Sequence, residues 1–451
     1  MYRPYLNGTL TWQDLFILVN EHRILLTRLL NLAELELNGI WNPLLQMVIN
    51  AGIHIAVILF IVSRLTVIIG RKHLPALLIF SAVLFGVPFA YENTLAAFQS
   101  QFYFVLFFSV LSLWLTVTHS PLSLRWWFGV GAGVMAFLSL ASGVFALAAS
   151  AAIGFGLFLL EIHQASKKEL AKQLVAVGVL GGLFVLGVVA TPTLAHHAHL
   201  KASSVMQFVD AMVAILAWPA EMGYLSALIR NLPGLILIGQ ILKSRPPATD
   251  RRWILVTMII WTFGTAVGVA YGRAAGPTAS RYLDIFVISI LVNFACLLEI
   301  SGRSILARPR LLTTMWVLAI FAALGIRAVN KLPQELAEKS ATGHAQEVNV
   351  RNYLATGEVA HLYNKPFLHV PYPDPNRLIA LLDSPQLRAI LPSNLTRSSG
   401  NIEATSTQSK EGGRLDGFCN LLLENFVFFI GLGLCISLGL VVLVLRTERS
   451  N

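Results

Sequence analysis

The sequence predicts an all-α integral membrane protein with about eleven transmembrane helices, an N-terminal interfacial amphipathic helix and a small outer-face cap before the last span. Composition is the first reason, because 56% of the 451 residues are hydrophobic and only 12% are charged. A soluble domain carries about 25% charged residues, so most of this apolar surface requires lipid as its solvent. Two further reasons are the recurrence of long apolar runs and the concentration of basic residues in every second loop between them.

The predicted spans follow from helix length, since about 20 apolar residues cross roughly 30 Å of hydrocarbon. They cover residues 44–64, 74–90, 103–119, 126–141, 144–161, 173–192, 224–242, 253–271, 282–300, 311–328 and 420–445. The fourth and fifth are short and separated only by Leu-Ala-Ser-Gly. They form either a tight pair or one broken element.

Loop charges predict the orientation. Lys and Arg concentrate in loops such as HQASKKELAKQ and KSRPPATDRR and in the tail RTERSN, whereas the alternate loops carry few. Basic loops face the cytoplasm by the positive-inside bias. We therefore expect an outer N-terminal segment (1–43) with the amphipathic helix, a bundle of about ten spans (44–328), an outer cap and flexible tether (329–418), and a final span with a cytoplasmic tail (419–451).

The predicted outer position of residues 1–43 raises a question of export, because this segment does not resemble a signal peptide. One explanation is an additional span upstream of Met1, missing through a misplaced start or a truncation.

Charge and cysteine usage exclude two classes of function. The net charge of +10 is spread between apolar runs rather than gathered on one soluble face, so we expect no nucleic-acid partner. Cys296, Cys419 and Cys435 show no CxxC spacing, which supports neither a disulfide framework nor a thiolate metal site. We predict no metal site and no cofactor, and leave dependence on a divalent metal open.

Candidate chemistry is expected at the outer surface, because the span interiors hold few ionisable groups apart from His54. A charge at the bilayer centre costs about 2.5–3.5 kcal/mol, so transporters keep such groups for the transport pathway. Their scarcity argues against an ion-coupled transporter.

The first outer segment contains a leucine stripe at positions 25, 26, 29, 30, 32, 35 and 37, typical of a helix lying in the membrane interface. Glu21, His22 and Arg23 are predicted in its first turn, where the helix dipole favours a carboxylate. They are either a helix cap with a solvated end or a carboxylate that acts as base or orienter beside a cation.

The second outer segment, YENTLAAFQSQFYF, interleaves Glu92, Asn93, Gln99 and Gln101 with aromatic residues. Amides suit sugar hydroxyls and aromatic faces suit the apolar face of a sugar ring. The alternative is an ordinary aromatic belt at the membrane interface.

The third outer segment, YGRAAGPTASRYLD, holds Arg273 and Arg281, two basic residues that run against the topology bias. A guanidinium there suits a lipid-linked phosphate, and the neighbouring Tyr282 is a further candidate for substrate binding. Asp284 lies three residues after Arg281, so a structural ion pair between them is the alternative.

Two weaker signals remain. His196, His197 and His199 lie in one outer loop but without a carboxylate or cysteine at ligand spacing, which argues against a metal site. Asn7 and Asn394 begin glycosylation sequons, which matter only in a eukaryotic secretory pathway.

At NEHRILLTRLL, YENTLAAFQSQFYF, SRYLD and YLATGE…KPFLHVPYPDPNRLIALLDSPQLRAILP, the chain resembles a group of bacterial polytopic proteins of the GT-C superfamily of membrane glycosyltransferases. That superfamily includes the protein mannosyltransferases and the aminoarabinose transferase of lipid A. The resemblance implies a site on the outer face of the inner membrane and a polyprenyl-phosphate sugar as donor. It also implies an acid in the first outer loop, a position that is empty here unless Asp14 or Glu21 substitutes.

The predicted function is therefore transfer of a sugar from a polyprenyl-phosphate donor to an acceptor glycan, lipid or protein. Glu21 or Glu92 would deprotonate or orient the acceptor hydroxyl, and Arg273 and Arg281 would hold the departing lipid phosphate. His22, Arg23 and the amides would position the sugar. The alternatives are a non-enzymatic flippase or transport component for lipid-linked sugars, and a truncated, inactive transferase scaffold.

Overall fold

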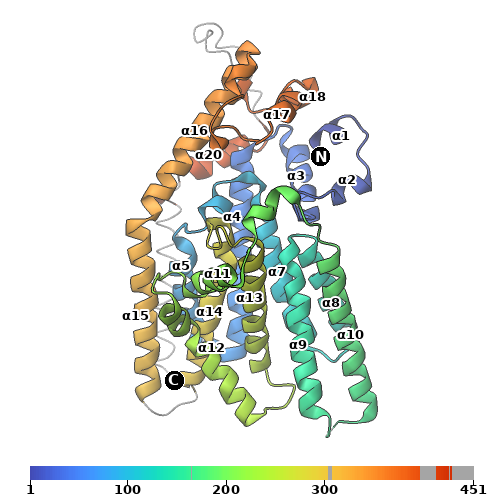
Figure 1. Cartoon of the computed structure of the whole chain (residues 1–451), viewed down its shortest axis with the longest axis vertical. Helices are drawn as coiled ribbons and strands as arrows, with labels where there is room; N and C mark the ends of the chain where they lie inside the picture. The colour runs from blue at the N-terminus through green and yellow to red at the C-terminus, as the bar shows by residue number, and fades with distance from the viewer. Residues whose placement is uncertain (164, 303–306, 397–412, 426, 429–451) are drawn as a thin grey trace. The chain divides into compact units, whose positions relative to one another are not determined.

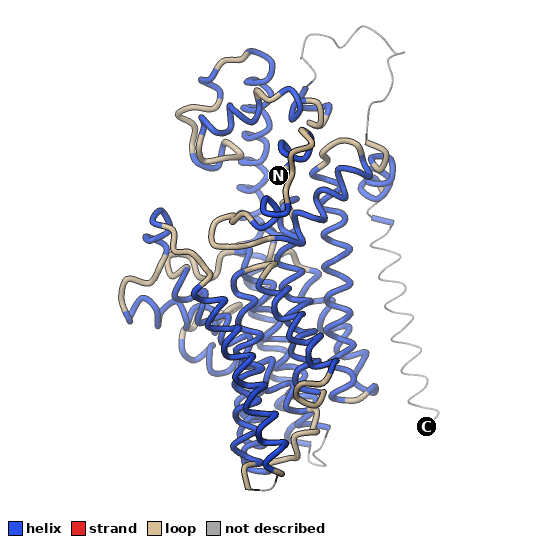
Figure 2. The backbone as a smooth tube through the Cα atoms, turned by 90° about the vertical axis from the view of Figure 1, so that its right-hand side faces the viewer, coloured by secondary structure: helices blue, strands red, loops and turns tan. Residues whose placement is uncertain are grey.

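The computed structural model describes residues 1–163, 165–302, 307–396, 413–425 and 427–428. Within these residues the protein is built from helices and connecting loops, and the pairing of extended backbone is limited to one isolated bridge between Val19 and His22 (Figure 2). An all-α architecture is what the apolar runs require, since a helix satisfies its own backbone hydrogen bonds in lipid.

Eight helices of the described part are long and apolar enough to cross a membrane. They are α4 (Pro43–Ile69), α7 (Ser100–Thr118, preceded by η2, Ala97–Gln99), α9 (Val144–Glu161, preceded by η3, Ala141–Gly143), α10 (Lys167–Val189), α12 (Tyr224–Ser244), α13 (Arg252–Gly272), α14 (Ser280–Gly302) and α15 (Ala307–Asn330). The chain is thus a multi-pass membrane protein by the length and composition of its helices.

The other predicted spans differ from this set. Residues 74–90 and 126–141 contain the shorter helices α5 (Leu74–Gly86) and α8 (Leu124–Phe137), and α8 forms a pair with α9 rather than one broken element. Most of the span predicted at 420–445 lies outside the described residues, which include α20 (Asp416–Glu424). The count of about eleven spans stays a prediction.

Sequence reasoning missed one apolar helix, α11 (Val205–Ala217), which packs against α12 and α13. At about 1.5 Å per residue it is too short to cross the hydrocarbon alone. Its last carbonyls accept hydrogen bonds from the buried Arg230 of α12, at 2.7 Å to Ile215 O and 3.1 Å to Leu216 O. The same guanidinium donates to Phe286 O of α14, so Arg230 connects the end of α11 to α14 through backbone carbonyls.

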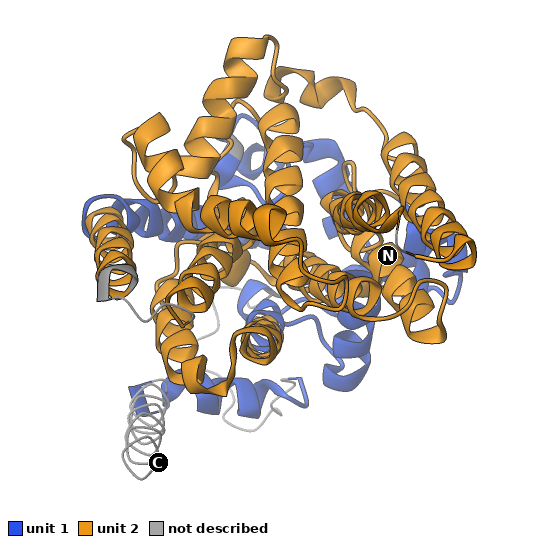
Figure 3. Cartoon of the chain, turned by 90° about the horizontal axis from the view of Figure 1, so that it is seen from below, with its two compact units in different colours: residues 1–17, 27–49, 329–433 blue, residues 18–26, 50–328, 434–451 orange. Residues whose placement is uncertain are grey.

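The chain divides into two compact units, coloured separately in Figure 3. The larger unit comprises residues 18–26, 50–328 and 434–451, the last of these outside the described residues. Within it α7 packs on α8, α9 on α10, and α13 on α9 and α14 (Figure 1). Glycines allow close approach: a Cβ added at Gly143 would lie 2.2 Å from the carbonyl carbon of Ala136. Small residues at such contacts are typical of helix packing in membranes.

The larger unit has two chemically distinct ends. At one end, which we call the Glu21 end, the loops 19–24, 90–99, 138–143, 190–204 and 272–281 bond to one another, for example through Leu25 N to Leu138 O and Ala275 N to Leu200 O. At the other, the basic end, Arg251 donates to Val67 O and Gly302 lies near His73. All the loops predicted to be basic within this unit alternate along the chain with those of the Glu21 end.

The smaller unit comprises residues 1–17, 27–49 and 329–433. Its helices are α1 (Tyr2–Leu6), α2 (Trp12–Phe16), α3 (Leu25–Asn38, most of which belongs here), the start of α4, α16 (Leu332–Thr356), α17 (Pro375–Leu382), α18 (Pro385–Arg388), α19 (Ser393–Thr396) and α20, with the 3-10 turns η5 (Val359–His361) and η6 (Phe367–His369). A small core joins Val350 and Tyr353 of α16 to Leu362, Leu378 and Leu382. Arg28 of α3 donates to Asp14 O and Leu15 O and so holds α2 on α3.

Candidate functional site

The stretch that carries Glu21 is a turn rather than the first turn of a helix. Val19 and His22 exchange two backbone hydrogen bonds, at 2.9 and 3.1 Å, and Asn20 adopts a φ of 52° between them. Asn tolerates this left-handed conformation better than most residues, so the turn forms locally. The prediction that Glu21, His22 and Arg23 lie in the first turn of the amphipathic helix is therefore wrong, because α3 begins only at Leu25.

Glu21 is buried and bound by two side chains from distant loops. Its Oε2 accepts a hydrogen bond of 2.8 Å from Nη2 of Arg273, which directly follows α13. Its Oε1 lies 2.6 Å from Nδ1 of His197, in η4 (Ala195–Leu200). Burial raises the pKa of Glu21, but the hydrogen bonds from His197 and Arg273 outweigh it and bring the pKa to about 2. The carboxylate is thus ionised throughout the neutral range.

This carboxylate fixes the proton position on His197. An ionised carboxylate only accepts hydrogen bonds, so Nδ1 of His197 must carry the proton that it shares with Glu21. In a neutral ring the remaining lone pair then lies on Nε2. An imidazole held in one tautomer by a buried carboxylate is an arrangement that suits proton transfer.

His22 and Arg23 anchor the turn to neighbouring loops. His22 Nδ1 accepts from Ala141 N at 3.3 Å, and Arg23 Nη1 donates to Ala190 O at 3.0 Å. Burial lowers the pKa of His22 to about 4, although the charge of Glu21 opposes this shift. A neutral imidazole that accepts a backbone hydrogen bond has a positioning role, and the predicted direct contact of His22 and Arg23 with substrate stays a prediction.

A second group of residues, the Glu92 cluster (Glu92, Asn93, Ser280, Arg281, Asp284), joins the loop after α5 to the start of α14. Glu92 accepts from Ser280 Oγ at 3.1 Å, from Arg281 N at 3.2 Å and from Arg281 Nη1 at 3.4 Å. A carboxylate at a helix N-terminus is favoured by the helix dipole. Glu92 therefore has a structural explanation as the cap of α14.

The sequence alternative that pairs Arg281 with Asp284 is wrong. Asp284 is 3% exposed and its Oδ2 accepts from Asn93 Nδ2 at 2.9 Å, whereas the Arg281 side chain is 45% exposed and reaches Glu92. Although the two residues are three positions apart, one faces the bundle interior and the other turns outward. The Arg281 guanidinium also lies 5.5 Å from the ring centroid of Tyr282, within reach of a cation–π contact.

The amides that the sequence assigned to sugar positioning bond within the protein. Asn93 is fully buried and donates to Arg281 O and to Asp284. Gln101, 6% exposed, donates to Gln99 Oε1 at 2.8 Å. Contact of Asn93 or Gln101 with a ligand would require rearrangement of these bonds.

The structure thus brings together Glu21 and Arg273, which were predicted from separate segments, and joins Glu92 to Arg281. Sequence reasoning missed His197 as a functional residue, because its carboxylate partner lies 176 positions away. It also gave Asp14 a possible catalytic role, but Asp14 Oδ2 accepts from Thr11 N and Thr11 Oγ1, both at 2.8 Å, and caps α2. Among the described residues no group of three or more His, Cys, Asp or Glu is arranged to hold a metal ion.

Comparisons of the chain with protein-family models, with curated proteins and with solved structures gave no match. Function is therefore argued from the residues and their geometry.

Proposed function

We propose that this chain is a multi-pass membrane glycosyltransferase of GT-C type. It transfers a sugar from a polyprenyl-phosphate donor to an acceptor glycan, lipid or protein at the Glu21 end. The observation that carries the proposal is the Glu21–His197–Arg273 group, in which a buried carboxylate, an oriented imidazole and a guanidinium meet at the end of the bundle where the polar loops gather. The resemblance of the loop sequences to the GT-C superfamily supplies the reaction class.

The geometry refines the role of Glu21. A general base works best with a pKa near the operating pH, and a carboxylate with a pKa of about 2 is a weak base. Glu21 therefore orients His197, and His197 Nε2 takes the proton of the acceptor hydroxyl. The hydroxyl oxygen bonds to the anomeric carbon as the bond from that carbon to the lipid phosphate breaks, and the phosphate leaves with the electron pair.

The leaving phosphate needs cationic partners. Arg281 is the more accessible candidate, because its side chain is 45% exposed and its contact with Glu92 is long at 3.4 Å. The Arg273 side chain is 18% exposed and already donates hydrogen bonds to Glu21 and to Gly272 O. It would therefore stabilise the phosphate through its positive charge rather than through a bidentate hydrogen bond.

Location follows from the alternation of basic and neutral loops. We propose that the basic end faces the cytoplasm and that the Glu21 end lies at the outer face of the bacterial inner membrane. The N-terminal segment and residues 329–418 would then be periplasmic and the C-terminus cytoplasmic.

The direct test is transfer of labelled sugar from polyprenyl-phosphate donors by purified protein. We expect His197→Gln to lower turnover by about 10²- to 10⁴-fold, the usual contribution of general base catalysis. The matched control is His196→Gln, because His196 neighbours His197 but is exposed. Wild-type turnover in His197→Gln would remove His197 as the base, and absence of transfer by the wild-type protein from any such donor would overturn the proposed reaction.

A second candidate function is transport of lipid-linked sugars. It is favoured by the ionisable pair His54 and Asp284, whose atoms Nε2 and Oδ1 lie 3.5 Å apart between α4 and α14. Movement of a labelled lipid-linked sugar across vesicles that contain the protein, without transfer, would favour transport over the transferase.

A further inference from the structure

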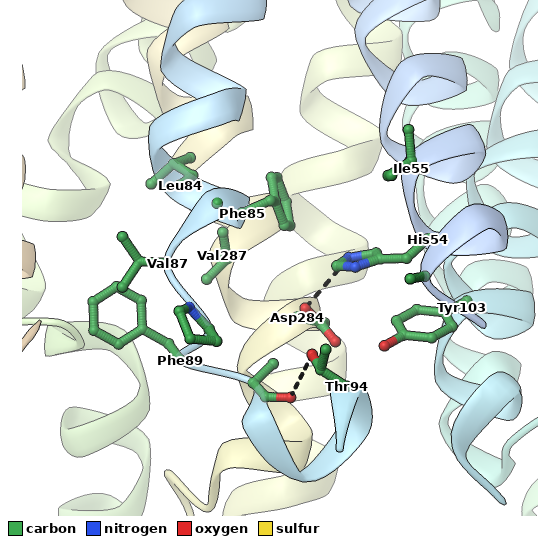
Figure 4. Close-up of a pocket in the computed structure, with 14 residues that line it drawn as sticks. His54, Ile55, Leu84, Phe85, Val87, Phe89, Thr94, Tyr103, Asp284 and Val287 are labelled. Carbon is green, nitrogen blue, oxygen red and sulfur yellow. Dashed lines mark hydrogen bonds and ion pairs between the residues drawn. The ribbon is translucent and has the colours of Figure 1, made fainter. Parts of the chain in front are cut away.

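A cavity of about 220 Å³ lies within the larger unit, between α4, α5, the loop that follows α5, α7 and α14 (Figure 4). Most of its lining is apolar, including Ile55, Phe85 and Val287. Its polar lining comes from His54, Thr94, Tyr103 and Asp284. Neither the Glu21–His197–Arg273 group nor the proposed transfer step uses these residues.

The polar side of the cavity holds an imidazole nitrogen without a hydrogen-bond partner among the described residues. His54 Nε2 faces Asp284 Oδ1 at 3.5 Å but makes no hydrogen bond with any described residue. The imidazole is fixed by Tyr103, whose ring stacks on it at 4.5 Å, and by the edge of Phe85 at 5.6 Å. Asp284 is fixed through Oδ2 by Asn93. The two atoms are therefore held in place, and His54 Nε2 has no hydrogen-bond partner among the described residues.

The residues that line the cavity indicate which ligand charge it accepts. It contains one carboxylate and neither Lys nor Arg, so an anionic group such as a phosphate is disfavoured. A hydroxyl both donates and accepts, so one hydroxyl can donate to Asp284 Oδ1 and accept from His54 in the tautomer that carries its proton on Nε2. An ammonium has no acceptor lone pair and cannot do this.

The volume of the cavity limits the size of the ligand. A cavity of about 150 Å³ lined by apolar side chains accepts benzene. A cavity of about 220 Å³ thus has room for a six-membered ring with several small substituents. Apolar walls with a few fixed polar groups are typical of small-molecule sites.

We propose that this cavity binds a neutral hydroxylated ring of monosaccharide size, with one hydroxyl between Asp284 and His54 and the ring against the apolar wall. The inference rests on the proposed function in naming a sugar as the source of that ring. Binding is nevertheless separable from transfer.

The test measures binding of three methyl glycosides by calorimetry, with the full chain in lipid nanodiscs so that no sugar-based detergent competes. The probes are methyl glucoside, the cationic methyl glucosaminide and the anionic methyl glucuronide, and methoxycyclohexane tests the ring alone. We expect methyl glucoside to bind at least tenfold more tightly than the glucuronide and methoxycyclohexane. Equal binding of methoxycyclohexane, or tighter binding of the glucosaminide, would overturn the assignment to a hydroxyl.

Three variants test the location of the site. Ala51 lines the cavity and Ala56 is exposed on the same helix. Ala51→Leu should fill the cavity and weaken methyl glucoside binding at least tenfold, whereas Ala56→Leu should leave it unchanged. Asp284→Asn should weaken binding about tenfold, because the amide has one acceptor oxygen where the carboxyl group has two, and Asn93 Nδ2 already uses one of them.

The outcomes separate the two proposals. Glycoside binding that is lost in Ala51→Leu supports this inference even if no transfer is found, in which case only the transferase fails. Glycoside binding that is unaffected by Ala51→Leu and Asp284→Asn overturns the inference, whatever the result for transfer.

Discussion

Glu21 and Glu34 are both buried glutamates, 8% and 5% exposed, yet their carboxyl groups are in opposite electrostatic environments. Glu21 meets Arg273 and His197, and its pKa falls to about 2. Both oxygens of Glu34, on α3, lack a hydrogen-bond partner among the described residues. Burial raises the pKa of Glu34 to about 7, against an opposing effect of the Gln46 amide.

The comparison shows that the partners of a buried carboxyl, more than its burial, decide its charge. Glu21 is a fixed anion suited to orienting a cation or an imidazole. Glu34 changes charge near neutral pH and so makes the stability of the protein depend on pH.

Removal of Arg273 should have the largest effect on stability, because it would leave Glu21 without its cation, as Glu34 is. We expect Arg273→Met to destabilise the protein by about 3–5 kcal/mol, since among the described residues it leaves the buried charge of Glu21 with His197 as its one side-chain partner. Chemical unfolding in mixed micelles at pH 7.5 measures this. The double variant Arg273→Met with Glu21→Gln should recover most of this lost stability. A loss below about 1 kcal/mol in the single variant would mean that the pair contributes no more than an exposed ion pair.

Glu34 should contribute a pH dependence of the next size. Its pKa is raised from 4.5 to about 7 on folding, so its stability contribution is complete below pH 4.5 and is lost as the pH rises through 7. The loss amounts to about 3 kcal/mol by pH 8. The measurement is the free energy of unfolding of the wild-type protein and of Glu34→Gln at pH 5 and at pH 8. The wild-type protein should lose more stability between the two pH values than the variant does. Parallel curves would mean that Glu34 is solvated or paired.

His22 should act in the opposite direction. Its pKa is lowered from 6.5 to about 4, so the unfolded chain binds a proton in that interval that the folded protein does not, and stability rises with pH between 4 and 6.5. The gain in the free energy of unfolding is about 3 kcal/mol. His22→Gln should flatten this part of the curve, and the exposed His196 provides the control variant His196→Gln. An unchanged slope in His22→Gln would contradict a buried, neutral His22.

The sequence was sufficient for the long helices, because lipid demands about 20 apolar residues per span and that requirement is legible residue by residue. It was insufficient for α11, whose 13 residues fall below that length and include Gln207 and Asp210, and whose last carbonyls accept hydrogen bonds from the distant Arg230. The Glu21 turn was assigned to the first turn of a helix because it directly precedes the leucine stripe, whereas the Val19–His22 hydrogen bonds form a separate turn and the helix begins only at Leu25.

Pairings across the bundle were beyond the sequence for a different reason. Arg273 and His197 reach Glu21 over 252 and 176 positions, and local spacing contains no signal for contacts at that range. His197 was set aside for want of a neighbouring carboxylate, and the carboxylate comes from another loop. The sequence thus revealed which residue types the site contains, but not the tertiary contacts between them.

Removal of Arg281 should have the smallest effect, and it completes the contrast with Arg273. The Arg281–Glu92 pair is long at 3.4 Å, and its side chains are 45% and 31% exposed. Exposed ion pairs contribute about 0–1 kcal/mol and are screened by salt. We therefore expect Arg281→Met to change the free energy of unfolding by less than about 1 kcal/mol, with a difference that shrinks further in about 1 M salt, whereas the effect of Arg273→Met persists there. A loss in Arg281→Met as large as that in Arg273→Met would mean that Glu92 depends on its cation as Glu21 does, and that Ser280 and the backbone of α14 do not suffice to hold it.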